Sequence, residues 1–328
     1  MTVFPTFEEV YPGVQQELKK AKQLRSKQKG KIIRYVVIGI IMWAAVLISA
    51  LMKASGSVTG TILFIVFISS FVLFGLMVRS VRDFHYSYKK TVVDAVLQEM
   101  FRLIEAPDDE EDYKYHVMYK PTDYIIGSDI SEGIMTRFVK NRGEDYTRGQ
   151  IGLTTFKFSE VELIDETTTT NDKDEEVVKD VTVFKGVAFI ADFHKDFDGK
   201  TYLFNKRLNR SDKLRLKKRK AFDIELEDMA FNKAFKTMTT NDIEARYILS
   251  SNLMERIVAF KNRAHGPVQI SFVNSNMYIF TETKKDLFEA RFWRSNDEKA
   301  LRNIYDEFMT YFNIVEEFTL NRRIWGKR

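Results

Sequence analysis

The chain of 328 residues contains no cysteine, five prolines and only four histidines. Without cysteine it can form no disulfide, no thiolate nucleophile and no cysteine-ligated metal site. It also lacks the glycine-rich phosphate loop, the G-x-S-x-G nucleophile motif, the H-E-x-x-H zinc motif and the G-x-G-x-x-G dinucleotide motif. The sequence therefore predicts no catalytic residue, no bound cofactor and no metal ligand.

Charge is almost absent from two long stretches near the N-terminus. Residues 32–52 contain one charged residue, Arg34, and residues 58–78 contain none. Each stretch has about 20 residues, the length at which a helix crosses about 30 Å of hydrocarbon. We expect a transmembrane hairpin over residues 32–78. The alternative is a pair of buried helices in a soluble core, although such helices are usually shorter and carry a polar face.

Basic residues flank this hairpin on both outer sides, whereas the connection between the two stretches has only Lys53. Because lysine and arginine flanks remain on the cytoplasmic side of a membrane, both termini are expected in the cytoplasm. Gly56 and Gly60 allow the chain to turn on the opposite side. The flanking basic residues are Lys19, Lys20, Lys22, Arg25, Lys27, Lys29, Lys31 and Arg34 before the hairpin, and Arg79, Arg82, Lys89 and Lys90 after it.

Apolar residues recur at spacings of three and four on both sides of the hairpin, which is the pattern of an amphipathic helix. We expect a basic N-terminal helix within residues 1–31 and a stalk helix over residues 79–106, ending before Pro107. Their two apolar stripes either pack together as an antiparallel stalk, or the N-terminal helix lies on the lipid surface. The stripes are Val10, Val14, Leu18, Ala21 and Leu24, and Val81, Phe84, Tyr88, Val92, Val96, Met100 and Leu103.

Residues 107–328 differ in composition from the hairpin, because they include segments rich in β-branched and aromatic residues. Strand-like segments occupy residues 115–119, 149–158 and 181–193, and Asn274–Asn276 is typical of a hairpin turn. Residues 165–179 offer little to bury and are expected to form a mobile hairpin loop. Helices are expected over residues 226–235, 252–264 and from Leu301 to Val315. The grouping of strands and helices predicts an α+β fold with a mainly antiparallel sheet.

Several segments resemble a known family. They are VFKGVAFIADFHKDFDGKTYLF at 183–204, LEDMAFNKAFKTMTTNDIEARYILSSNLMERI at 226–257 and GEDYTRGQIGLTTFKFSEVEL at 143–163. They are similar to segments of the bacterial membrane proteins grouped as domain-of-unknown-function family 3137. The resemblance covers most of residues 110–290 and the two-span arrangement. It implies a protein tethered in the bacterial inner membrane, and it brings no established activity and no catalytic residue.

Residues 206–220 form the most basic segment of the chain. The segment is interpreted as a solvated loop, as a contact for anionic lipid headgroups, or as a nucleic-acid patch. Nucleic-acid binding is the weakest of the three interpretations, because no aromatic residue is interleaved for stacking on bases. The candidate lipid contacts are Lys206, Arg207, Arg210, Lys213, Arg215, Lys217, Lys218, Arg219 and Lys220.

A second charged group consists of Arg246 with Glu227 and Asp228. Acid–base chemistry is one interpretation, but no histidine or nucleophile lies nearby in the sequence. A structural ion pair that fixes how two helices meet is the simpler hypothesis, with the apolar residues after Arg246 indicating burial. Glu244 is expected to complete a capping box with Asn241.

One further acidic segment, from Asp192 to Gly199, departs from a calcium loop. His194 stands at the first position of such a loop and Asn205 at the twelfth. A strand end is therefore expected, with Phe193 and Phe197 directed into the core and the acidic residues facing water.

Together these patterns predict a membrane-anchored cytoplasmic binding or assembly module. The expected partners are the lipid bilayer, anionic lipid headgroups and a membrane or cytoplasmic protein, with a second copy of the chain among the candidates. The alternative is a membrane-bound enzyme whose site is assembled from distant residues. A deep polar pocket with converging ionisable groups would favour the enzyme, and an exposed apolar patch would favour the binding module.

Overall fold

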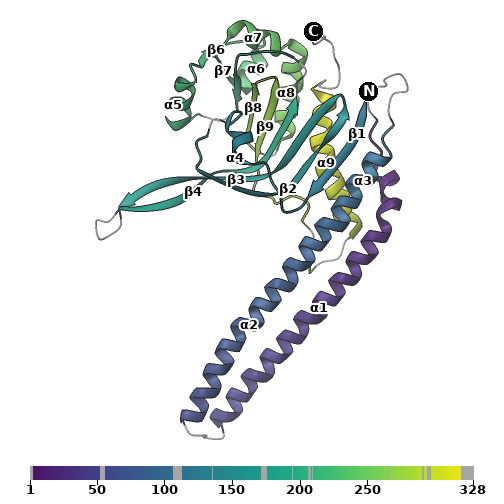
Figure 1. Ribbon diagram of the computed structural model, residues 1–328, viewed down its shortest axis with the longest axis vertical. Coiled ribbons are helices and arrows are strands. Elements are labelled where there is room, and N and C mark those ends of the chain that lie inside the picture. Colours follow the sequence, from purple (N-terminus) through teal and green to yellow (C-terminus); the bar gives the residue numbers. More distant parts are fainter. Residues whose placement is uncertain are drawn as a thin grey trace. The chain divides into compact units, whose positions relative to one another are not determined.

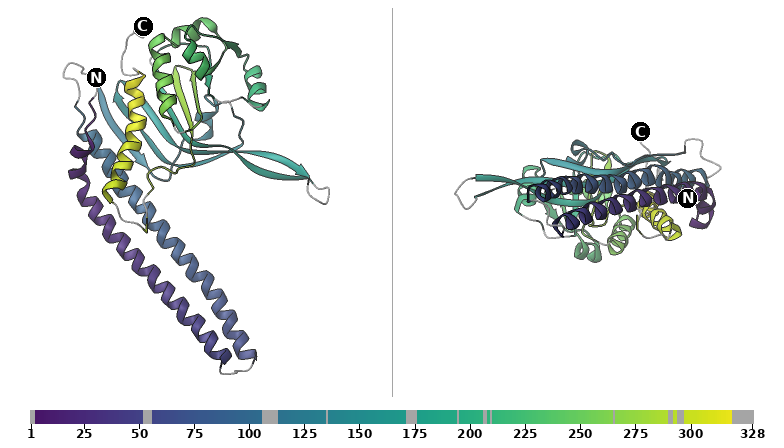
Figure 2. Two further views of the ribbon diagram at one scale, coloured as in Figure 1. Left: turned by 180° about the vertical axis from the view of Figure 1, so that it is seen from behind. Right: turned by 90° about the horizontal axis from the view of Figure 1, so that it is seen from below.

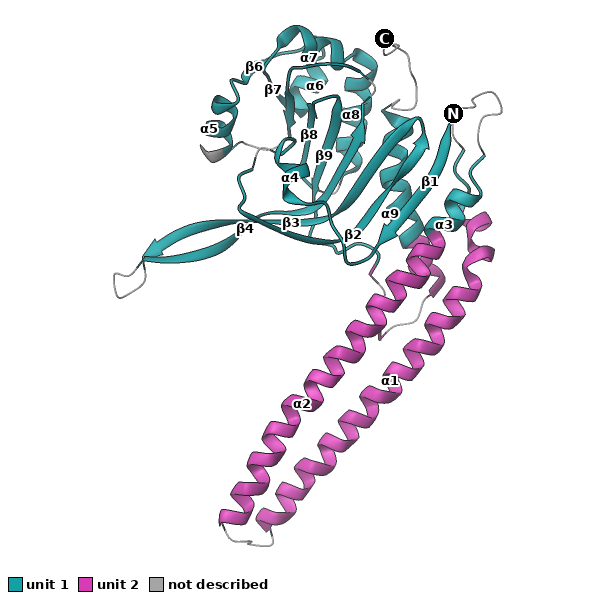
Figure 3. Ribbon diagram, viewed as in Figure 1, with its two compact units in different colours: residues 1–6, 97–288, 304–328 teal, residues 7–96, 289–303 magenta. Residues whose placement is uncertain are grey.

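A computed structural model describes residues 3–51, 56–105, 113–134, 136–170, 176–193, 195–205, 208, 210–264, 266–289, 292–293 and 297–318. The chain divides into two compact units (Figure 3). We call Phe7–Val96 together with Glu289–Asn303 the hairpin unit. Met1–Thr6, Leu97–Phe288 and Ile304–Arg328 form the sheet unit. Each unit is described below by itself.

The hairpin unit is built on two long helices, α1 (Phe7–Leu51) and α2 (Gly56–Tyr88), which lie side by side and antiparallel (Figures 1 and 2). Both helices are long and apolar enough to cross a membrane. Only 11% of the most apolar window of the first helix and 6% of that of the second are buried. A core helix of a soluble protein would bury most of such a window, so the two helices indicate membrane association.

Beyond the apolar stretches, the two amphipathic stripes face each other. Val10, Val14 and Leu18 on α1 are buried, as are Tyr88 and Val92 on the opposite arm. The helix after α2 continues through a π-helix (Lys89–Val93), which α1 contacts, into α3 (Asp94–Arg102). The structure therefore has the packed stalk, the first of the two arrangements considered from the sequence.

The described residues of the sheet unit form nine strands in the order β1-β2-β3-β4-β9-β8-β5-β7-β6. Every neighbouring pair is antiparallel, which confirms the predicted α+β class with an antiparallel sheet. The strands are β1 (Lys114–Lys120), β2 (Lys140–Gly152), β3 (Thr154–Thr170), β4 (Glu176–Asp192), β5 (Thr201–Phe204), β6 (Phe222–Ile224), β7 (Lys236–Thr239), β8 (Val268–Val273) and β9 (Asn276–Glu282). The helices are α4 (Gly127–Ser131), α5 (Arg210–Lys218), α6 (Met229–Ala234), α7 (Asp242–Ile248), α8 (Ser251–Arg263) and α9 (Asp297–Glu317), of which α9 also contributes to the hairpin unit.

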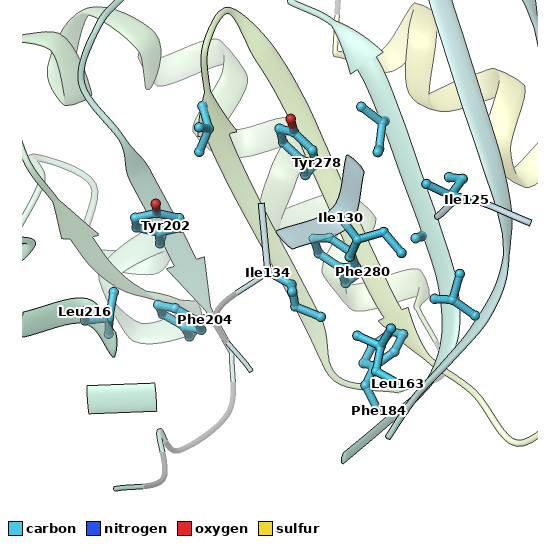
Figure 4. Close-up of a cluster of buried hydrophobic side chains, with 14 of the residues drawn as sticks. Ile125, Ile130, Ile134, Leu163, Phe184, Tyr202, Phe204, Leu216, Tyr278 and Phe280 are labelled. Atoms are coloured by element: carbon cyan, nitrogen blue, oxygen red, sulfur yellow. The ribbon is translucent and has the colours of Figure 1, made fainter. Parts of the chain in front are cut away.

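Two apolar clusters hold this sheet. In one, Ile130 of α4 and Leu216 of α5 join side chains of the strands, among them Leu163 and Phe280 (Figure 4). The other is aromatic and includes α9. Phe312 is fully buried, and its ring centroid lies 5.6 Å from that of Phe156 on β3 and 5.7 Å from that of Phe308. Aromatic pairs at these spacings add to the free energy of area burial.

Two local expectations differ from the structure. Residues 149–158 were expected to form one strand, but the chain reverses between β2 and β3, where Ile151 pairs with Thr154. Gly152 has a φ of 60° there, a conformation that suits a two-residue hairpin turn. Residues 165–179 were expected to be a loop. The ladder instead continues to the pair Thr170–Glu176, and the β3–β4 ribbon extends beyond the rest of the sheet (Figure 1); residues 171–175 lie outside the described residues.

The turn between β8 and β9 follows the sequence expectation. Asn274 and Ser275 both have positive φ angles, 51° and 56°, and Val273 pairs with Asn276 across the turn. A two-residue turn with both central residues in this region matches the right-handed twist of the strands that it joins.

Candidate functional site

A polar pocket of about 350 Å³ lies on the sheet unit beside β2, β3 and β4. Gly143, Val161 and Gly186 form one row across these three strands. A Cβ atom at either glycine would overlap a backbone carbonyl oxygen of the neighbouring strand, so only glycine allows the strands to approach this closely. The pocket is lined by Thr122, Arg142, Gly143, Glu144, Glu160, Val161, Glu162, Lys185, Gly186, Thr283, Lys285 and Asp286.

A β-bulge brings three carboxylates together next to this pocket. The register of β2 against β3 shifts between Glu144 and Thr147, and Asp145 has a φ of 62°. Such a bulge redirects the side chains of the strand that carries it. Oxygen atoms of Glu144, Asp145 and Glu160 lie within 4.8 Å of one another. Asp145 is fully buried and Glu160 is 8% exposed. We call these three residues the acidic cluster.

The buried members of the acidic cluster accept hydrogen bonds from the protein. The Tyr119 hydroxyl donates to Asp145 Oδ1, and the backbone N–H of Leu287 donates to Glu160 Oε1. A buried carboxylate is costly without such donors, so these contacts stabilise the bulge. Among the described residues this cluster is the group that can hold a metal ion, because carboxylate oxygens are the ligands that magnesium and calcium prefer.

Two pairs of charged groups line the pocket. Arg142 donates a hydrogen bond of 2.8 Å to Glu162, and Thr182 donates one of 2.7 Å to the same carboxylate. The Arg142 hydrogen bond, and after it that of Thr182, lowers the pKa of Glu162. Lys185 lies 2.9 Å from Asp286, and this hydrogen bond raises the pKa of Lys185. No described lining residue is a histidine, and the buried carboxylate among the lining residues is that of Glu160.

The basic segment forms α5 rather than a loop over residues 210–218. Arg215 donates to the backbone carbonyls of Ser131 and Thr136 at 3.1 and 3.2 Å. Arg219 donates to the carbonyls of Ser131 and Glu132 at 2.7 and 2.8 Å. The two guanidinium groups therefore hold the end of α4 and the chain after it, whereas the sequence made both candidates for lipid contact.

The other basic residues of this segment are placed differently. Those with exposed side chains are Lys213, Lys217, Lys218 and Lys220. Lys206 and Arg207 lie outside the described residues, as does the side chain of Arg210. The exposed lysines are the part of the segment that is free to meet an anionic partner.

The structure pairs Arg246 with Glu227 but not with Asp228. Arg246 also lies 3.2 Å from Asp242 and donates to the carbonyl of Glu225 at 3.0 Å. Asp228 instead caps α6 by accepting a 2.9 Å hydrogen bond from the N–H of Phe231. The Arg246 and Glu227 side chains are 38% and 71% exposed. The sequence predicted a buried pair, but the structure shows an exposed one. Exposed ion pairs contribute little to stability.

The neighbouring cap also differs in one detail. Asn241 accepts from the N–H of Glu244, as in a capping box. The Glu244 carboxylate does not complete the box, because it accepts from the N–H of Gly199 instead. In the preceding acidic segment, Phe193 and Phe197 are buried and Asp196 and Asp198 are exposed; His194 lies outside the described residues.

The comparisons with known proteins concern the C-terminal part of the chain. Residues 182–320 match the model of a family described as protein of unknown function DUF3137. The chain resembles this family. No curated protein matches it, and no solved structure does. The matched range runs from β4 to α9 and contains the pocket residues Lys185 and Asp286. The acidic cluster and the segment at 143–163 precede that range.

Sequence reasoning did not identify the acidic cluster. Glu144 and Asp145 follow Gly143 in the middle of a strand, and this glycine is the one local sign of an irregular strand. Glu160 belongs to another strand, and the sequence around it has no pattern that indicates a functional site. Only the register between β2 and β3 shows that the three carboxylates meet.

The Tyr119–Asp145 contact leads to a prediction about stability. Replacing Tyr119 with Phe removes a donor to a fully buried carboxylate, and a hydrogen bond to a charged group is worth about 1.5–3 kcal/mol. We expect Tyr119→Phe to lower the free energy of unfolding by about that amount, measured by chemical denaturation of the purified chain in detergent. Tyr247→Phe, at a tyrosine that is 44% exposed, is the control and should change little. Equal effects of the two variants would contradict a structural role for the Tyr119 hydroxyl.

Proposed function

We propose that the protein is a membrane-anchored binding or assembly module whose sheet unit lies in the cytoplasm. One observation carries this proposal. The apolar windows of two long helices leave most of their side chains uncovered by the rest of the chain, including Leu47 at 65% and Phe74 at 66% exposure. A continuous apolar surface of this kind needs an apolar solvent, and a lipid bilayer supplies one.

The distribution of charge supports the orientation. Basic residues cluster outside the two apolar stretches, and Lys53 is the one charge in the connection between them. By the positive-inside rule both termini are cytoplasmic. The resemblance to a family of bacterial membrane proteins supports the bacterial inner membrane as the location.

Binding is favoured over catalysis by the chemistry of the sheet unit. Arg142 with Glu162 and Lys185 with Asp286 are paired beside its polar pocket, and no described lining residue is a histidine. Large apolar side chains are exposed on β6, α6 and α7: Phe222 at 47%, Met229 at 86% and Ile243 at 81%. β6 is also the last strand of the sheet, and an edge strand can accept another chain. A protein partner, including a second copy of this chain, suits such a surface.

The alternative function is a membrane-bound enzyme with a site assembled from distant residues. The observation that favours it is the acidic cluster beside the pocket, which joins Glu144 and Asp145 of β2 with Glu160 of β3. A divalent cation held there would face a pocket large enough for a small ligand. The hydrogen bonds that Asp145 and Glu160 already accept favour a structural role for the cluster.

The topology leads to a prediction. Because the basic flanks remain in the cytoplasm, a reporter inserted after Ala54 should lie on the external side, and one fused after Arg328 should lie in the cytoplasm. A phosphatase that is active only outside the cytoplasm and a protein that fluoresces only inside it distinguish the two sides. The opposite pattern at both sites would overturn the proposed orientation.

The exposed lysines of α5 are a proposed contact for anionic lipid. Lys213, Lys217 and Lys218 are exposed on this helix, and Leu214 beside them is 55% exposed. Near an anionic leaflet each basic residue contributes about 1 kcal/mol of attraction. Lys206, Arg207 and Arg210 add positive charge to the same segment of the sequence.

A prediction follows for the full chain reconstituted in vesicles. A polarity-sensitive dye on a Leu214→Cys variant should shift its emission to shorter wavelength in anionic vesicles but not in zwitterionic ones. The shift should disappear at high salt, because salt screens exposed charges. Replacing Lys213, Lys217 and Lys218 with Gln should also abolish it.

The control removes the same charge elsewhere. Lys179, Lys233 and Lys284 are exposed and lie outside α5, so their replacement with Gln should leave the shift unchanged. If both triple variants lost the shift equally, net charge rather than the α5 surface would explain it. If neither lost it, α5 would have no lipid contact.

A further inference from the structure

A segment far along the chain packs on the two long helices of the hairpin unit. Its start, Glu289, lies 3.0 Å from His85 and 3.3 Å from Lys89. Further along, Asp297 lies 2.7 Å from Arg25 of α1. The side chains of Arg25 and Asp297 are only 11% and 9% exposed, so this ion pair is largely shielded from solvent. The segment is thus fixed to the helices at two separate points.

Between these two points the described residues are Phe292 and Trp293. Phe292 packs on Phe84 of α2, with ring centroids 5.2 Å apart, and is 4% exposed. Trp293 accepts a 3.1 Å hydrogen bond at its carbonyl oxygen from Lys29 of α1. Residues later in the chain contact α1 farther from the apolar stretches: Asp297 pairs with Arg25, and Arg302 pairs with Glu8. Among the described residues of this segment, Phe292 and Trp293 therefore make the contacts that lie nearest the apolar stretches.

The Lys29 contact of Trp293 lies within the thickness of one lipid headgroup layer from the first apolar stretch, measured along α1. Ile33, in the first apolar stretch, follows Lys29 by about 6 Å along α1, and Val78, the last residue of the second stretch, precedes Phe84 by about 9 Å along α2. The headgroup layer on each side of the hydrocarbon is about 5–8 Å thick. Tryptophan is enriched at this depth because its ring is apolar and its N–H is polar.

Trp293 has the exposure and the charged surroundings that such an anchor needs. Its side chain is 65% exposed, whereas the adjacent Phe292 holds the segment in place. The Lys29 ammonium lies 5.9 Å from the centre of the indole ring, within the range of a cation–π contact. In the sequence Trp293 stands between Arg291 and Arg294, and basic residues favour the phosphate layer.

We infer that Trp293 is a third membrane contact of this protein, inserted into the lipid headgroup layer from which α1 and α2 emerge. The inference rests on the proposed anchoring of the hairpin in a bilayer. It gives the connection between β9 and α9 a lipid partner, in addition to its two attachments to the helices.

The test uses the full chain and its small number of tryptophans, which is three. Replacing Trp43 and Trp325 with Phe leaves Trp293 as the single indole. The variant is reconstituted in vesicles of equal parts zwitterionic and anionic phospholipid that carry a nitroxide either near the headgroup or near the end of the acyl chain. We expect the shallow nitroxide to quench Trp293 fluorescence strongly and the deep nitroxide to quench it weakly.

The matched variant keeps only Trp43, which lies in the middle of the first apolar stretch, and should be quenched most by the deep nitroxide. If Trp43 is quenched in this way and Trp293 by neither nitroxide, the inference about Trp293 is wrong and the anchor stands. If neither tryptophan is quenched, the anchoring proposal itself fails.

Discussion

The apolar surface of α1 and α2 is the constraint on which the hairpin unit depends. Each Val, Leu, Ile or Phe side chain left in water forgoes about 1.5–3 kcal/mol of transfer free energy. The exposed ones are concentrated in the windows that are only 11% and 6% buried. No internal packing can offset so large an uncovered surface, whereas a bilayer removes it from water without further contacts. The packed stripes beyond the apolar stretches then continue the same helices out of the lipid.

Several buried polar groups of the sheet unit are satisfied internally. Arg215 and Arg219 donate to carbonyls at the end of α4, Asp228 caps α6, and Tyr119 donates to the buried Asp145. Buried polar groups are tolerated only when they are paired in this way. Apolar side chains are exposed near the β6 edge, and the lysines of α5 are exposed. These are the surfaces that the proposed partners would contact.

The sequence predicted the elements whose signal is local. The apolar stretches, the stripe from Val10 to Ala21 and the Asn274–Ser275 turn each carry their pattern within a few residues. The hairpin at Gly152 was missed, because the β-branched and aromatic residues on its two sides look like one strand. The threonines at 167–170 looked like a loop because their cross-strand partners cannot be recognised from composition. The exposure of Arg246 and the internal partners of Arg215 depend on tertiary contacts. The acidic cluster depends on a register shift, so no single segment could reveal it.

The most direct test of the account is whether water reaches the exposed faces of the two long helices in a native membrane. The chain has no cysteine of its own, so single cysteines report without background. Phe74 is 66% exposed within the apolar stretch and Tyr86 is 46% exposed beyond it. Lipid around α2 predicts that Tyr86→Cys reacts rapidly with N-ethylmaleimide, while Phe74→Cys reacts only after the membrane is dissolved and the chain denatured, because hydrocarbon suppresses the thiolate. Equal labelling of both cysteines in intact membranes would contradict it.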